Sequence, residues 1–108
     1  MTAEAFKRQF EALSAEYRSG LPRKFAELDG LWRDLAGGTA EPGRLADLQR
    51  ELHTLAGTAR TLGIAGVSEA AAAAETFLEP YSKRRKLPPP ARHAEFQRLL
   101  EALKQAAR

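Results

Sequence analysis

The sequence predicts an all-α protein, an antiparallel four-helix bundle with an additional N-terminal helix. Alanine and leucine are abundant, valine and isoleucine are scarce, and apolar and polar residues nowhere alternate for long as they would in strands. Apolar residues instead recur every three or four positions in five segments that glycine or proline separates. A chain of 108 residues is expected to form one domain, residues 1–108.

The first predicted helix covers residues 2–18. Thr2 is a suitable N-cap, because its hydroxyl can accept a hydrogen bond from an unpaired amide of the first turn. Ser19 and Gly20 are expected to end this helix. Its apolar positions have the spacing of a buried stripe and are Phe6, Phe10, Leu13 and Tyr17.

The second predicted helix covers residues 21–36. Pro22 suits its first turn, because the N–H that proline lacks has no helical partner there, and Gly37 and Gly38 end the helix. We interpret its aromatic residues as core rather than as a cofactor site, because they fall at helical spacing. The apolar positions are Leu21, Phe25, Leu28, Trp32 and Leu35.

The third and fourth helices, residues 44–62 and 65–79, are predicted to form a hairpin that turns at Gly63. Glycine is a common helix stop, and so short a connector brings the next helix back antiparallel. The fourth helix is rich in alanine, which lets two backbones approach closely. The third carries an apolar seam at Leu45, Leu48, Leu52, Leu55, Ala59 and Leu62.

An exposed linker is expected after the fourth helix, because Pro80 and the prolines at 88–90 interrupt the helical pattern. The basic run Lys83–Lys86 lies in it. Such a run can bind nucleic acid or an acidic surface, but a solvated loop is favoured because no aromatic residues are interleaved with the basic ones. The last predicted helix, residues 90–107, carries Phe96, Leu99, Leu100 and Leu103 on one side.

The composition, with 44% apolar and 29% charged residues, is that of a globular protein rather than a disordered one. No apolar run could span a bilayer, and the N-terminus lacks a secretory pattern, so a cytoplasmic location is expected. Met1 and a helical C-terminus suit a complete small protein. The absence of cysteine from the sequence excludes disulfides and thiolate chemistry.

His53 is predicted to face solvent from the third helix. At 100° per residue, the centre of the leucine seam lies about 130° from it. Gln49, Gly57 and Arg60 lie within about 40° of His53, and Ala56 lies at about 60°. A glycine inside a helix costs about 1 kcal/mol relative to alanine, so Gly57 suggests a flat place where a partner protein can approach.

An exposed imidazole can attack phosphorus, because at neutral pH one of its nitrogens carries a free lone pair. Arg60 could pair with the phosphoryl oxygens, and Gln49 could hold the other ring nitrogen. The sequence contains no phosphate-binding glycine loop, no paired carboxylates near His53 and no nucleotide signature, so it is not expected to be an enzyme that takes phosphate from ATP. No cofactor is expected, and Mg²⁺ and an acceptor aspartate would come from the partner.

The segment His53–Gly63, HTLAGTARTLG, resembles the motif of the histidine-containing phosphotransfer (HPt) domains of phosphorelays, and the resemblance extends over essentially the whole chain. It implies that His53 is phosphorylated and that receiver domains, of response regulators or hybrid kinases, dock at Gly57. Leu55 would be a core position and Gly63 the helix end. The family often has lysine at the position of Ala56, which we place in the docking surface, so Arg60 becomes the candidate cation.

The expected function is therefore that of a phosphocarrier that uses His53, and the alternative is an HPt-like docking module that regulates a kinase or receiver without carrying phosphate. A basic protein that binds nucleic acid is a weaker third. A monomer is expected in each case. His93, at the edge of the last apolar stripe, is interpreted as a packing or exposed residue without function.

Overall fold

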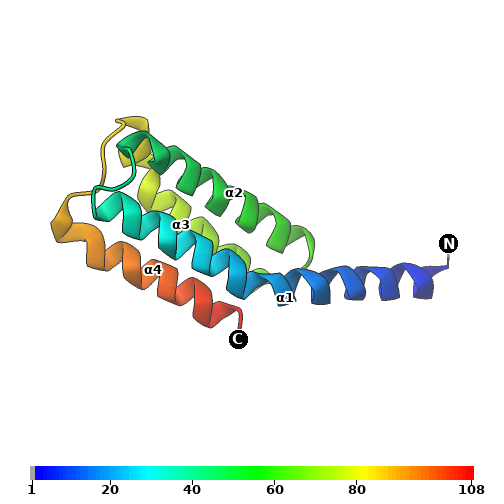
Figure 1. The fold of residues 1–108 in the computed structure, drawn as a ribbon. Helices are drawn as coiled ribbons and strands as arrows, with labels where there is room; N and C mark the ends of the chain where they lie inside the picture. Colours follow the sequence, from blue (N-terminus) through cyan, green and yellow to red (C-terminus); the bar gives the residue numbers. More distant parts are fainter. Residues whose placement is uncertain (1) are drawn as a thin grey trace.

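The computed structural model describes residues 2–108 and contains no strand within them. The all-helical prediction is therefore confirmed. In Figure 1 consecutive helices run in alternate directions and lie side by side. The elements are α1 (Ala3–Ala36), the short 3₁₀ helix η1 (Pro42–Arg44), α2 (Leu45–Thr61), α3 (Ala65–Lys83), the 3₁₀ helix η2 (Pro90–Arg92) and α4 (His93–Ala106).

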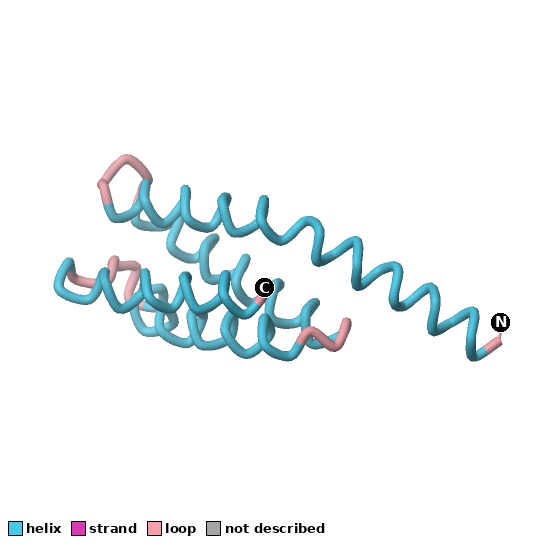
Figure 2. Tube along the Cα trace, turned by 90° about the horizontal axis from the view of Figure 1, so that it is seen from below, coloured by secondary structure: helices cyan, strands magenta, loops and turns pink. Residues whose placement is uncertain are grey.

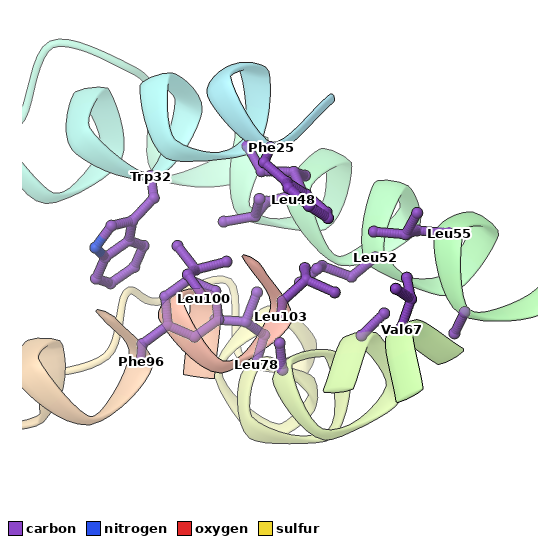
Figure 3. Packing of buried hydrophobic residues seen from close by; sticks show 14 of the residues in the cluster. Phe25, Trp32, Leu48, Leu52, Leu55, Val67, Leu78, Phe96, Leu100 and Leu103 are labelled. Atoms are coloured by element: carbon purple, nitrogen blue, oxygen red, sulfur yellow. The ribbon is translucent and has the colours of Figure 1, made fainter. Parts of the chain in front are cut away.

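The four α-helices enclose one apolar core, because α1 and α3 each contact both α2 and α4. Figure 3 shows side chains of all four helices meeting there. The rings of Trp32 and Phe96 lie 4.6 Å apart. Every predicted apolar position of residues 21–36 is buried, and so is the seam of α2 except Leu62, which is half-buried. Truncation of such a leucine to alanine costs about 2–5 kcal/mol of stability.

One continuous helix, α1, replaces the two helices predicted for residues 2–18 and 21–36. The predicted break at Ser19 and Gly20 is wrong. Pro22 lies inside the helix, where it removes only the bond that its N–H would give to Arg18, and the surrounding helix formers carry the helix through. The Ser19 hydroxyl donates to the Glu16 carbonyl at 2.7 Å, which adds a bond beside the missing one.

The N-terminal half of α1, residues 3–20, extends beyond the ends of the other helices, and we call it the arm (Figures 1 and 2). Its predicted burial is wrong: Phe6 is 62% and Leu13 is 56% exposed, while Phe10 and Tyr17 are half-buried. The stripe has the expected periodicity, but the bundle ends where α2 turns into α3. Nothing within the described chain lies opposite the outer part of the arm.

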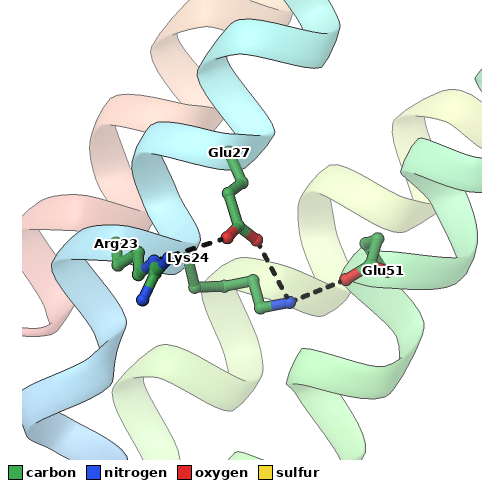
Figure 4. Close-up of polar contacts among 4 residues, drawn as sticks. All are labelled: Arg23, Lys24, Glu27 and Glu51. Carbon is green, nitrogen blue, oxygen red and sulfur yellow. Dashed lines mark hydrogen bonds and ion pairs between the residues drawn. The ribbon is translucent and has the colours of Figure 1, made fainter.

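A pair of charged side chains fixes α1 against α2 just after the arm ends (Figure 4). The Lys24 ammonium lies 2.9 Å from the Glu51 carboxylate and 3.7 Å from that of Glu27. The hydrogen bond to Glu51 raises the pKa of Lys24 above its ordinary value. Exposed pairs of this kind contribute about 0.2–1 kcal/mol each, so their main consequence here is to set the register of the two helices.

The far end of the bundle matches the predicted exposed linker in part, because Lys83–Lys86 are exposed as expected. Helix α3 continues through Pro80 to Lys83, four residues past its predicted end, because Phe77 and Tyr81 stack on each other across the proline and on Arg92. Pro88 is buried rather than exposed. Among the helices of residues 2–108, none combines the length and the hydropathy needed to cross a membrane.

Candidate functional site

His53 lies on the outer face of α2, away from the buried leucine seam, and 75% of its side chain is exposed. Gly57 is exposed one turn later, and a Cβ added to it would meet no atom within 4 Å. The fold itself therefore does not require glycine at this position. A shallow hollow beside the histidine is lined by His53, Thr54, Gly57, Thr58, Thr61 and Leu62.

A carboxylate of α3 holds one nitrogen of the His53 ring. The Nδ1 atom lies 2.8 Å from Oε2 of Glu75, whose side chain is only 23% exposed. A carboxylate without a proton can only accept a hydrogen bond, so in the neutral form of the ring this contact favours the tautomer with the hydrogen on Nδ1 and the lone pair on Nε2. Within residues 2–108 no hydrogen bond engages Nε2, which leaves this nitrogen available to an electrophile.

The hairpin of α2 and α3 brings this pair together across 22 residues of sequence. Both helices leave the turn at Ile64, and His53 precedes this residue by as many positions as Glu75 follows it. The turn is closed by Gly63, whose φ is 75°, and by the Ile64 amide, which donates to the Ala59 carbonyl at 2.8 Å. Sequence reasoning assigned the orienting role to Gln49 and missed Glu75.

Ala56 is not part of the exposed face, contrary to its predicted place in a docking surface. Its residue is only 3% exposed, because the alanine-rich α3 packs closely on this side of α2. The Ala56 carbonyl accepts a hydrogen bond of 2.8 Å from the hydroxyl of Ser68, which is also buried. This position therefore sets the spacing of the two helices and presents no side chain to a partner.

Arg60 and Gln49 flank the histidine on the same helix. Arg60 is exposed and pairs with no carboxylate of the described chain. The Cα–Cβ bond of a helical residue tilts toward the N-terminus of its helix, which from Arg60 is the direction of His53, two turns away. Gln49 is half-buried, and its predicted bond to the ring is replaced by that of Glu75.

His93 has a different environment, in agreement with its interpretation as a packing residue. It is half-buried, its Nε2 atom lies 2.9 Å from the Pro88 carbonyl oxygen, and its ring meets Trp32 edge-on at 5.0 Å. Within residues 2–108, no three His, Cys, Asp or Glu side chains form a group that could hold a metal ion. Of the two histidines, His53 is the one whose ring stands mostly in solvent.

Comparison with known proteins agrees with the motif at His53. The model of the Hpt domain family matches residues 5–106, which is nearly the whole chain. A search of curated proteins gave no match. A search of solved structures also gave none. Because the family model covers the helices, the hairpin and the exposed histidine together, the chain belongs to the Hpt domain family.

Proposed function

We propose that the chain is a phosphocarrier of a cytoplasmic two-component phosphorelay. In this role His53 accepts a phosphoryl group from the aspartyl phosphate of one receiver domain and passes it to the aspartate of another. The observation that carries the proposal is the His53 ring itself, exposed at Nε2 and held at Nδ1 by Glu75. A surface that only docked a partner would not need a carboxylate behind the ring.

The transfer follows from the state of the two ring nitrogens. The Nε2 lone pair attacks the phosphorus of the aspartyl phosphate, a P–N bond forms, and the P–O bond to the aspartate breaks with its electrons on the leaving carboxylate. The proton on Nδ1 stays in place. The positive charge that the ring gains lies against the Glu75 carboxylate, which stabilises it, and the reverse steps deliver the group to the second aspartate.

The surroundings of His53 suit a receiver as the partner. Gly57 and the shallow hollow leave room for a backbone to approach the ring closely. Arg60 is our candidate for the cation that pairs with the phosphoryl oxygens, in place of a lysine that would have to begin from the buried position of Ala56. The Mg²⁺ ion that neutralises phosphoryl charge would be held by the receiver.

The test is phosphoryl uptake from a panel of receiver domains that have been phosphorylated on their aspartate. We expect acid-labile label on the wild-type chain and on His93→Ala, and none on His53→Ala. Phosphorus NMR should place the group on Nε2. Label on His53→Ala at the wild-type level would refute the proposal. Receiver binding that survives His53→Ala, with no label on the wild type, would instead establish the docking module.

A further inference from the structure

The His53 ring is open on the side that faces away from α3. Glu75 of α3 holds Nδ1 at 2.8 Å, and the two nitrogens of an imidazole point in divergent directions, so Nε2 is directed away from Glu75. The shallow hollow beside the ring lies on that side, because its threonines are turned about 80–140° from His53, in the sense opposite to Ala56, which packs against α3. A partner that reaches Nε2 therefore lies over this hollow.

A second hollow continues the first toward the root of the arm, which we define as residues 13–20, since Leu62 at the end of α2 lines both hollows. The second hollow exposes mainly apolar surface and is lined by Leu13, Glu16, Tyr17, Gly20, Leu21, Lys24 and Leu62. At one end the Ser14 hydroxyl donates to the Leu62 carbonyl at 3.4 Å. At the other end the Lys24 ammonium pairs with Glu51, which precedes His53 by two residues. The two hollows therefore form one concave surface that spans α2 and α1.

The arm root leaves apolar surface uncovered in this second hollow. Leu13 is 56% exposed, and Tyr17 beside it is half-buried. A Cβ added to Gly20 would meet no atom within 4 Å, so no group of residues 2–108 fills the space above this glycine. The hollow has room for an apolar side chain of another protein, and its burial there would stabilise the complex.

We propose that the receiver domain that docks at His53 extends past Leu62 and packs on the arm root, so that α1 forms part of its binding surface. The identity of this partner rests on the phosphocarrier function proposed above. The receiver is the occupant because the second hollow is continuous with the surface over which phosphorus must reach Nε2. Apolar side chains of the receiver fill the hollow, and Glu16 and Lys24 lie at its rim.

The size of a protein interface agrees with this extent. A standard interface buries about 800 Å² of each partner, which corresponds to a round patch of roughly 16 Å radius. Leu62 follows His53 by about 13.5 Å along α2, so it lies inside a patch centred on the ring. Phe6 precedes Ser14 by a further 12 Å or about that distance along the arm, and lies outside the patch. The receiver therefore covers the arm root and leaves the tip free.

The concentration dependence of phosphoryl uptake tests the role of Leu13. We expect Leu13→Glu to raise the half-saturating concentration of a phosphorylated receiver at least about tenfold, because a carboxylate would be buried in an apolar hollow. The maximal rate should stay within about twofold of the wild-type rate, since the ring and Glu75 are unchanged. Ala15→Glu, on the opposite face of the arm, is the matched control. Equal half-saturating concentrations for Leu13→Glu and Ala15→Glu would overturn the proposal.

Two further controls separate docking from chemistry and the root of the arm from its tip. Phosphoramidate is a small phosphoryl donor that needs no docking surface, and it should label His53 at the same rate in the wild type and in Leu13→Glu. A loss with phosphoramidate as large as the loss with the receiver would overturn the docking role of Leu13. Phe6→Glu should leave the half-saturating concentration of the receiver within about twofold of the wild-type value, because the tip lies outside the patch.

Amide NMR shifts of the wild-type chain locate the receiver without any substitution. Addition of each unphosphorylated receiver of the panel should shift Leu13, Tyr17 and Gly20 together with Gly57. Such shifts without any transfer of label would support the docking surface and refute the phosphocarrier function. Label on His53 with a shift at Gly57 and none in the arm root would refute the docking surface alone. Neither shifts nor label with any receiver would overturn both proposals.

Discussion

The two histidines of this chain are held by opposite ring nitrogens and by acceptors of different charge. In His53 the Glu75 carboxylate takes Nδ1 and the ring stands in solvent. In His93 the neutral Pro88 carbonyl takes Nε2, and the ring lies half-buried against Trp32. The difference teaches that two features distinguish His53: a charged acceptor behind the ring and an open side in front of it. Burial and a neutral acceptor give a packing residue.

Removal of the charged acceptor should have the largest effect on His53. We expect Glu75→Ala to lower the rate of phosphoryl uptake about 10–100-fold, the usual cost of losing a group that orients and charges a reactive histidine. Glu75→Gln should fall in between, because its amide oxygen still accepts from Nδ1–H but carries no charge. The measurement is the initial rate of labelling by a phosphorylated receiver.

The matched control for Glu75 is Glu79→Ala, one turn further along α3, where the carboxylate pairs with Lys83. It should label at the wild-type rate. Equal rates for Glu75→Ala and the wild type would show that the carboxylate does not assist the ring, and the contrast between the two histidines would then reduce to exposure alone.

For stability the order of the two histidines should be reversed, so that substitution of His93 lowers the free energy of unfolding more than substitution of His53. His93→Ala removes the bond to the Pro88 carbonyl and the contact with Trp32, so we expect the free energy of unfolding to fall by about 1–3 kcal/mol. His53→Ala should change it by less than about 0.5 kcal/mol, as an exposed substitution. Urea unfolding followed by the fluorescence of Trp32 measures both. A stable His93→Ala chain that failed to take up phosphate would give His93 a functional role.

Arg60 should give the smallest effect. We expect Arg60→Ala to slow phosphoryl uptake by about threefold to tenfold, through the loss of one charge-assisted contact to the phosphoryl group. Arg50→Ala is the control, because Arg50 is exposed on the same helix and pairs with Asp47. If both variants slowed uptake equally, the effect would come from net charge rather than from contact with the phosphoryl group.

Periodicity in the sequence predicted which face of each helix is apolar but not what covers that face. Leu21 to Leu35 and Phe6 to Tyr17 have the same kind of spacing, yet the first set is buried and the second is exposed or half-buried. The break predicted at Ser19 and Gly20 failed for a related reason. Local propensity describes single residues, and one continuous helix costs only one missing bond at Pro22.

The site was predictable in part. The angle from the leucine seam placed His53 in solvent and Arg60 beside it. The same rule misplaced Ala56. This residue lies about 60° around the helix axis from His53, which is close to the boundary between the exposed and the buried face, and the position of that boundary depends on how closely α3 packs. Glu75 lies on another helix, so helical spacing within α2 could not find it. In a helical hairpin, residues at equal distances before and after the turn lie level with each other. Counting outward from Ile64 in both directions would therefore have identified Glu75 as the neighbour of His53.

Because His53 and Glu75 lie at equal distances from Ile64, the length of the connection between α2 and α3 matters more than the length of the other loops. A residue inserted between Leu62 and Ala65 would disturb the turn that Gly63 and the Ile64 amide close, and we expect it to shift Glu75 away from the ring even if every helix still formed. Insertions in the loop at residues 37–41 would leave the pair intact. A scan of single-residue insertions should therefore find one intolerant connection beside a permissive one, within a chain whose composition and helix content barely change.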